Sequence, residues 1–121
     1  MSDLSNDMAL ITKVIGQYVE GARTGKGSVM QPAFRDDATI VGYVGSDLFA
    51  GPIRLLFEWN DANGPAKDVS ARIASIEVAG TVATARLEVS NWTGQSYTDL
   101  FTLLKDPAGW RIAQKAFHTH A

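Results

Sequence analysis

The fold of this chain is decided by residues 95–120, which read QSYTDLFTLLKDPAGWRIAQKAFHTH. The first limb, 95–105, alternates two sets of side chains with the period of two that is typical of a β-strand. Residues 106–109, Asp-Pro-Ala-Gly, supply a turn, because proline fixes φ and glycine accepts a positive φ. The second limb, 110–119, is again rich in aromatic and aliphatic residues. The sequence therefore predicts one long β-hairpin.

Both limbs of this hairpin carry large apolar side chains on both faces, so neither face can remain in water without a cost in free energy. We expect helices from the N-terminal half of the chain to cover one face. We expect a second copy of the chain to cover the other face, through residues such as Leu100, Leu104 and Phe117. The sequence thus predicts a homodimer that forms through the outer face of the sheet.

The composition is that of one soluble domain, spanning residues 1–121. Apolar residues make up 45% of the chain, the formal net charge is −2, and lysine and arginine are scattered. This charge pattern gives no footprint for nucleic acid or an anionic membrane. The chain has no cysteine, which excludes disulfides and a cysteine nucleophile. Because neither a signal sequence nor a membrane span is visible, we expect a cytoplasmic protein.

Helices are predicted mainly in the first half of the chain. An apolar stripe with spacings of three and four predicts a helix over residues 3–22, capped by Ser2 or Asp3. A capping-box pattern predicts a short helix over residues 28–34. A third helix is predicted over residues 52–60, with a proline at its first position.

Strands are predicted mainly in the second half, separated by glycine turns. β-branched residues predict a first strand over residues 38–44, between a polar turn at 35–37 and a loop at 48–51. Two further strands, 70–78 and 82–92, precede the hairpin. Since helices and strands are segregated along the chain, the pattern predicts an α+β fold rather than a parallel doubly wound one.

Four local patterns cover nearly the whole chain: Q-Y-V-E-G at 17–21, F-x-x-D-A-T at 34–39, G-P-I-R at 51–54 and, at 99–112, D-x-F-x-L-x-K followed by G-W-R-I. In this order they resemble the nuclear transport factor 2-like superfamily, and within it the small proteins grouped as lumazine-binding-like or SnoaL-like. The resemblance implies a cystatin-like fold, in which a curved, mixed or antiparallel sheet wraps around the long first helix and forms a cone. It also implies a binding pocket in that cone.

Ketosteroid isomerases are one class of this superfamily with known chemistry. They use a tyrosine on the first helix and a protonated aspartate on a late strand as an oxyanion hole, and a second aspartate as the base. The resemblance places Tyr18 and Asp99 at the first two positions. Gly42 occupies the position of the base, where it cannot accept a proton, and Phe57 replaces a supporting tyrosine. We therefore do not expect steroid isomerisation.

Asp99 is the most informative candidate residue. It shares a strand face with Tyr97, Phe101 and Leu103, and a carboxylate among such neighbours must be paired, hydrogen-bonded or protonated. If that face lines the pocket, Asp99 belongs to the site; if it faces outward, Asp99 is a solvated strand residue. Tyr18 also has two interpretations, as a site residue or as a core residue whose hydroxyl reaches one partner.

Histidine and tryptophan residues supply the remaining candidates. His118 and His120 point to one strand face, a spacing that can serve a metal, but no third ligand follows from the spacing and chain ends fray. We therefore predict no metal site, although His118 alone could reach the mouth of the pocket. Trp59 could wall the pocket, Trp110 belongs to a core strand, and Trp92 is expected at an exposed or interface position.

These observations predict a homodimeric protein that binds a small, flat, largely apolar ligand and needs no cofactor. The predicted pocket residues are Tyr18, Leu56, Trp59, Leu87, Asp99, Phe101, Gln114 and His118. One alternative is an isomerase, dehydratase or cyclase, in which Tyr18 and Asp99 stabilise an enolate-like anion and His118 is the base. The other alternative is a structural or interaction domain whose own side chains fill the pocket.

Overall fold

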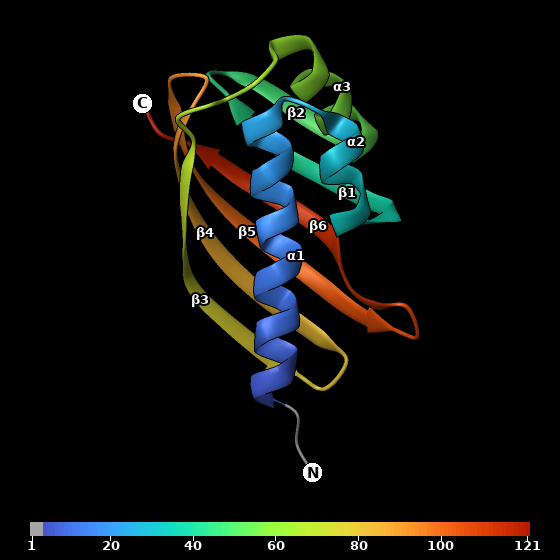
Figure 1. Cartoon of the computed structure of the whole chain (residues 1–121). Helices are drawn as coiled ribbons and strands as arrows, with labels where there is room; N and C mark the ends of the chain where they lie inside the picture. Colours follow the sequence, from blue (N-terminus) through green and yellow to red (C-terminus); the bar gives the residue numbers. More distant parts are fainter. Residues whose placement is uncertain (1–3) are drawn as a thin grey trace.

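The computed structural model describes residues 4–121. They form a curved sheet with helices on one side of it (Figure 1). In chain order the elements are α1 (Leu4–Thr24), α2 (Gly27–Met30), the 3-10 turn η1 (Gln31–Ala33), β1 (Phe34–Val44), β2 (Asp47–Pro52), α3 (Arg54–Asn63), β3 (Ser70–Ala79), β4 (Val82–Trp92), β5 (Gln95–Asp106) and β6 (Gly109–Thr119). The N-cap expected at Ser2 or Asp3 lies outside the described residues.

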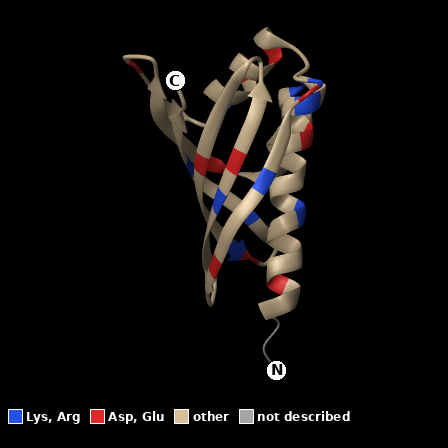
Figure 2. Ribbon diagram, turned by 90° about the vertical axis from the view of Figure 1, so that its left-hand side faces the viewer, with Lys and Arg blue, Asp and Glu red and all other residues tan. Residues whose placement is uncertain are grey.

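The described strands form one mixed sheet in the order β2-β1-β6-β5-β4-β3. β3 to β6 make the predicted antiparallel meander, which ends in the β5–β6 hairpin. β1 is parallel to β6, and β2 is antiparallel to β1. Figure 2 shows α1 lying along one side of this sheet, with acidic and basic residues interspersed over the ribbon. The predicted α+β fold with a curved sheet and a long first helix is confirmed, and the sheet is not closed.

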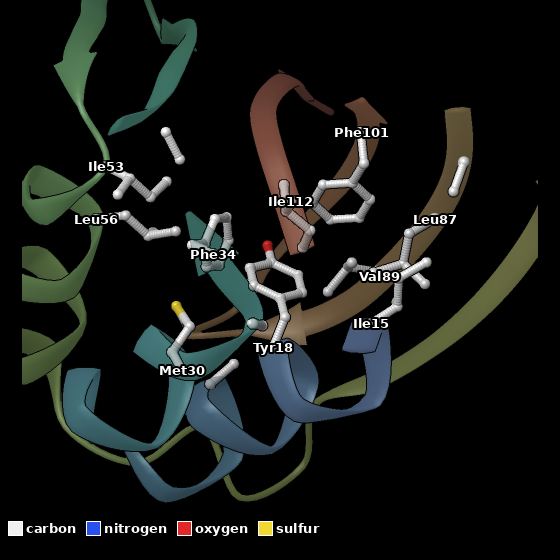
Figure 3. Close-up of a cluster of buried hydrophobic side chains, with 14 of the residues drawn as sticks. Ile15, Tyr18, Met30, Phe34, Ile53, Leu56, Leu87, Val89, Phe101 and Ile112 are labelled. Atoms are coloured by element: carbon white, nitrogen blue, oxygen red, sulfur yellow. The ribbon is translucent and has the colours of Figure 1, made fainter. Parts of the chain in front are cut away.

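α1 supplies much of the core. The buried residues of its apolar stripe are Ile11, Ile15, Tyr18 and Ala22. Figure 3 shows Tyr18 rising from α1 into the middle of the cluster, between Phe34 and Phe101. Both of these rings meet the Tyr18 ring edge to face, with centroid separations of 5.9 and 5.3 Å. Neither α1 nor any other helix within residues 4–121 is long and apolar enough to cross a membrane.

α3 lies beyond the C-terminal end of α1 (Figure 1) and is fastened there by polar contacts. The side chain of Asn60, which is fully buried, donates a hydrogen bond of 2.9 Å to the carbonyl oxygen of Gly21. The backbone N–H of Gly27 donates one of 2.7 Å to Asp61 Oδ1. Gly21 also allows α1 and α2 to approach closely, because a Cβ at this position would collide with the backbone of Met30.

The segment between β1 and α3 differs from the expectation. Residues 47–52 form β2, where the sequence predicts a loop at 48–51, because they pair with β1 across a tight turn. Pro52 therefore ends a strand instead of beginning a helix. The N–H of Ile53 still donates a hydrogen bond of 2.9 Å to the carbonyl oxygen of Ala38, so α3 begins only at Arg54.

The polar turn expected at residues 35–37 is part of β1 instead. Arg35 forms an ion pair of 2.8 Å with Asp37 and one of 3.3 Å with Asp106. Asp106 lies beside the β5–β6 turn. The pairing of β1 with β6 shifts register between Phe34 and Thr39. This irregular stretch accommodates polar side chains that a regular, covered strand would exclude.

A bulge in β4 reverses the expected position of Trp92. Pairing with β5 is regular up to Val89 and shifts before Trp92, with Asn91 at a φ of 59°. One extra residue turns all later side chains to the opposite face of the sheet. Trp92 is therefore 2% exposed, and the expectation of an exposed or interface position is wrong.

A second bulge, in β6, has the same effect on the last strand. Thr102 pairs with Gln114 but Leu103 pairs with Ile112, so Ala113 is the extra residue. Lys115 beyond the bulge faces the helices, whereas alternation counted from the start of the limb places it outside. The bulge therefore places Lys115 in the candidate site.

The same bulge changes the surface that the expected dimer would use. Phe117 faces inward, where its ring meets those of Phe49 and Tyr97, so it does not belong to the outer face. On that outer face Leu100 is 53% exposed and Leu104 is half-buried. A dimer through the outer face stays a prediction.

Candidate functional site

A buried polar group connects α1 with β5 and β6. The Tyr18 hydroxyl donates a hydrogen bond of 2.7 Å to Asp99 Oδ2, and Lys115 Nζ lies 3.8 Å from Asp99 Oδ1. The exposed fractions of the three residues are 1%, 0% and 4%. Their proximity follows from the strand register, in which Phe101 pairs with Lys115 and Asp99 pairs with Phe117. Asp99 and Lys115 are thus diagonal neighbours on the inner face of the sheet.

Burial shifts the protonation equilibria of this group. Burial raises the pKa of the Asp99 carboxyl above its usual value, although the nearby Lys115 and the Tyr18 hydrogen bond oppose the shift. Burial lowers the pKa of the Lys115 ammonium, and Asp99 opposes that shift. Burial, followed by the charge of Asp99, raises the pKa of Tyr18 well above its usual value, which keeps the hydroxyl protonated. The shifts at Asp99 and Lys115 both favour the neutral carboxylic acid and the neutral amine.

Aromatic rings surround the Lys115 ammonium. Its Nζ atom lies 4.9 Å from the ring centroid of Tyr18, 5.0 Å from that of Trp92 and 5.3 Å from that of Phe117. The negative faces of these rings favour the charged ammonium, whereas the loss of water around it favours the amine. The protonation state of Lys115 is therefore set by two opposing influences of its surroundings.

A cavity of about 30 Å³ lies beside Lys115, between α3 and the sheet. A cavity of this size holds one or two water molecules. Its other lining residues are aliphatic or aromatic: Ile40, Val44, Phe49, Leu56, Trp59, Trp92, Tyr97 and Phe117. A wider surface depression next to it shares Val44, Trp59 and Tyr97 as lining residues.

Two buried polar atoms beside Lys115 have unused hydrogen-bonding capacity. Within residues 4–121, the buried side-chain atoms without a hydrogen-bond partner are Trp92 Nε1, Asp99 Oδ1, Asn60 Oδ1 and Arg111 Nε, and of these four residues Trp92 lines the cavity. The 3.8 Å between Lys115 Nζ and Asp99 Oδ1 also exceeds a hydrogen-bond distance. Buried polar atoms in folded proteins are nearly always paired. The arrangement can therefore accept a polar group of a bound molecule.

The structure brings four of the predicted site residues together. Leu56 and Trp59 of α3 line the cavity. Tyr18 and Asp99 do not line the cavity, but both contact Lys115, which does. Asp99 points inward and is fully buried, so it is not a solvated strand residue, but it does not line the cavity either.

The other four predicted residues lie elsewhere. Leu87 and Phe101 are buried in the core around Tyr18 (Figure 3) and do not line the cavity. Gln114 is exposed on the outer face, where the β6 bulge places it. His118 is exposed as well, but it borders the surface depression at the mouth of the cavity.

His118 and His120 pack against each other, with ring centroids 4.9 Å apart. The Nε2 atom of His120 lies 2.9 Å from Thr98 Oγ1, which donates a hydrogen bond to Glu88. Between residues 4 and 121, no group of three His, Cys, Asp or Glu side chains could hold a metal ion. This pair therefore has the contacts of a surface network.

Sequence reasoning missed the central residue, Lys115, together with Trp92, Tyr97 and Phe117. The strand also contains Arg111 and Gln114, so a lysine in it is no special signal, and regular alternation from Trp110 would place Lys115 on the solvent face. No glycine or proline marks the bulge at Ala113, so the local sequence gives no reason to shift the register.

Gly42 stands where the resemblance places the base of an isomerase, and the structure explains why it has no side chain. It pairs with Phe117 across the parallel strands β1 and β6. A Cβ at Gly42 would lie 2.5 Å from both the carbonyl oxygen and Cδ1 of Phe117. The space of the catalytic carboxylate is thus filled by an aromatic ring.

Residues 6–118 match the family model described as "Putative lumazine-binding". The chain belongs to this family. Two members of the wider nuclear transport factor 2-like group, both solved structures of unknown function, are similar to this lumazine-binding-like chain over its full length. The protein from Methylobacillus flagellatus KT has 48% identity and a TM-score of 0.94, with 100% of this chain and 96% of that chain covered.

The second solved structure, from Shewanella baltica OS155, has 35% identity and a TM-score of 0.92, with 100% of this chain and 98% of that chain covered. A curated relative, "Aldolase FrzH" from Cladobotryum sp., is 30% identical over 104 residues, which cover 85% of this chain and 83% of the relative. These relatives place the lumazine-binding-like chain among nuclear transport factor 2-like proteins.

Proposed function

We propose that this protein binds a small, flat, largely apolar molecule that carries a carbonyl group, in the cavity beside Lys115. One observation carries the proposal: a single cationic side chain, 4% exposed, ends at a cavity whose other lining residues are aliphatic or aromatic. Aromatic walls suit a flat ligand, and a few polar anchors fix its orientation. The Lys115 ammonium and the free Trp92 N–H are donors that a carbonyl oxygen can accept from.

Ligand entry requires side chains to move. The cavity of about 30 Å³ is smaller than any organic ligand of this class, and Trp59 and Phe49 are half-buried at its edge. Rotation of the Trp59 ring, which lines both spaces, would widen the cavity toward the surface depression, and rotation of the Phe49 ring would enlarge the cavity itself. Side-chain rearrangements of this kind are common on binding. The family description supports the ligand class, because lumazine is a flat heterocycle with ring carbonyl groups.

Isothermal titration calorimetry with lumazine and other flat carbonyl compounds tests this proposal. We expect saturable binding of at least one compound, and a rise in Kd of about tenfold in Trp59→Ala, because one aromatic stacking partner contributes about 1–3 kcal/mol. Val82→Ala on the exposed outer face is the control and should leave Kd unchanged. Equal affinity of the two variants would place the ligand outside the cavity.

Catalysis on such a ligand is a second candidate function. It is favoured by the relative whose name describes an aldolase, since an aldolase makes or breaks a carbon–carbon bond beside a carbonyl group. Such a reaction needs a proton carrier and a donor that stabilises an enolate-like anion. Asp99 and the Tyr18 hydroxyl have these capacities, and Lys115 connects them to the cavity.

Exchange of the α-protons of 2-acetylnaphthalene with deuterium, followed by NMR in D₂O, separates binding from catalysis. An enzyme of this class should accelerate the exchange, and Asp99→Asn should slow it by about a hundredfold or more, the usual contribution of general acid–base catalysis. The Kd of the ketone should change little, because Asp99 does not line the cavity. Exchange at the buffer rate in the wild-type protein would remove catalysis and leave binding.

A further inference from the structure

We propose that Lys115 is a nucleophile whose Nζ atom forms an imine with an aldehyde or ketone bound in the cavity, with Asp99 as its proton partner. The inference rests on the proposed function, since it needs a carbonyl ligand beside Lys115. It goes further because it assigns a covalent bond between Lys115 Nζ and the carbonyl carbon of the ligand. It also narrows the ligand class to compounds whose carbonyl carbon is open to attack by an amine.

The position of Lys115 suits attack more than structural pairing. An ammonium that serves only as a partner of a buried carboxylate forms a charge-assisted hydrogen bond of about 2.7–2.9 Å. Here the distance from Nζ to Asp99 Oδ1 is 3.8 Å, while Tyr18 occupies Oδ2 at 2.7 Å. Among residues 4–121, Lys115 is the charged residue that lines the cavity, and its Nζ has no closer acceptor. The nitrogen is therefore held near a carboxyl group but remains available to a ligand.

The protonation state required for attack is also supported. Only the neutral amine is nucleophilic, and lysines in desolvated pockets use this state for imine chemistry. The titratable groups around Lys115 are Asp99 and Tyr97 on β5 and Tyr18 on α1, whereas α3, β1 and β2 contribute apolar side chains to the cavity. Burial lowers the pKa of Lys115 against the opposing influence of Asp99, so its neutral fraction at neutral pH exceeds that of a surface lysine.

The step balances with the groups present. The lone pair of the amine attacks the carbonyl carbon, the C–N bond forms, and the carbonyl oxygen takes up the proton that leaves nitrogen, with Asp99 as the relay. Asp99, in its acid form, then protonates the hydroxyl of this adduct, which departs as water while the C=N⁺ bond forms. The products are a protonated imine on Lys115, one water molecule and the Asp99 carboxylate, which pairs with the new cation.

Reductive trapping tests the inference directly. The wild-type protein is incubated with 2-naphthaldehyde and sodium cyanoborohydride at neutral pH, and the adduct is located by intact mass and peptide mapping. Among the lysines we expect the fastest adduct on Lys115, because a lowered pKa leaves more of its side chain as the reactive amine, and the α-amino group is followed separately by peptide mapping. The four other lysines in the chain are Lys13, Lys26, Lys67 and Lys105. Similar rates at all five would overturn the inference.

Two matched variants and a pH profile sharpen the test. Lys115→Arg should abolish the fast adduct, whereas Lys67→Arg, at an exposed position, should leave it unchanged. The rate of labelling of wild-type Lys115 should reach its plateau at a lower pH than the rates of the surface lysines, and this arm needs no variant to fold. A Lys115 profile that coincides with the surface profiles would contradict a nucleophilic lysine.

The alcohol 2-naphthalenemethanol separates the two proposals, because it has the same ring system without a carbonyl group. If the alcohol binds in calorimetry and the aldehyde gives no adduct at Lys115, imine formation is refuted and ligand binding stands. If neither compound binds and no adduct forms, the proposed function fails and the inference fails with it. Binding of both, with an adduct on Lys115 alone, supports both proposals.

Discussion

Replacing Lys115 with methionine is expected to lower the free energy of unfolding by about 3–5 kcal/mol near pH 8, the usual cost of removing one partner from a buried ion pair. Methionine fills a similar volume but leaves Asp99, which is fully buried, with Tyr18 as its hydrogen-bond partner. Burial already raises the pKa of Asp99, and without Lys115 nothing cationic opposes the increase. A carboxyl group whose pKa is raised in the folded state costs stability above its unfolded pKa and nothing below it. The loss should therefore be large near pH 8 and small near pH 4.

Urea denaturation at several pH values from 4 to 8 measures the change in the free energy of unfolding. The double variant Lys115→Met with Asp99→Asn should recover most of the loss near pH 8, because an amide still accepts the Tyr18 hydrogen bond and carries no charge. Lys67→Met, at an exposed position, is the control and should change stability little at any pH. A loss that is independent of pH, or a double variant that loses the sum of both single effects, would contradict the assigned pairing.

Replacing Trp92 with alanine is expected to cost about 3–5 kcal/mol, the usual range for large-to-small substitution of a buried aromatic residue. Its ring meets those of Tyr18, Trp59 and Tyr97 at centroid separations of 5.6, 5.6 and 5.8 Å. Its position therefore joins the core to the wall of the cavity. A tryptophan on the outer face, where regular alternation places it, would cost within about 0.5 kcal/mol. The substitution thus distinguishes the bulged strand from a regular one.

Urea denaturation also measures this second effect, with Leu100→Ala on the exposed outer face as the control for an apolar truncation. Indole provides an independent check, since a dry cavity left by a large side chain binds molecules of matching shape. Indole should raise the Tm of Trp92→Ala and leave that of the wild-type protein unchanged. A loss below about 1 kcal/mol would show that Trp92 does not contribute to the core.

The parts of the fold with a regular local period follow from the sequence. The period of three and four in α1 and the alternation of β5 are properties of short windows, so Ile11 and Ile15 could be assigned to the buried stripe of α1, and Phe101 to the strand face of Asp99 and Leu103. The same alternation grouped Asp99 with apolar neighbours, which indicated an unusual carboxylate. The resemblance to ketosteroid isomerases paired Asp99 with Tyr18, and the hydrogen bond of 2.7 Å between them agrees with that pairing.

The parts that could not be predicted depend on contacts between distant segments. A single extra residue at Ala113 or near Asn91 reverses the face of all that follows, and its position is fixed by the register with β5. Asn91 carries a weak signal, because asparagine tolerates a positive φ, but alanine carries none. The sequence therefore offers no reason to include Lys115 among the candidate residues, and it predicts Trp92 at the surface. Three residues that line the cavity, Trp92, Lys115 and Phe117, owe their orientation to these two bulges.

The parallel pairing of β1 with β6 also governs the order in which the molecule can form. Thr39 of β1 pairs with Gln114 of β6, the last strand of the chain. One edge of β1 therefore stays unpaired until β6 has joined the sheet. Contacts so far apart in sequence impose a large loop-closure cost, and topologies dominated by them fold slowly. Until β6 adds, Asp99 lacks its cationic neighbour and the cavity lacks one wall. Completion of the sheet and assembly of the buried Tyr18–Asp99–Lys115 group are therefore a single event.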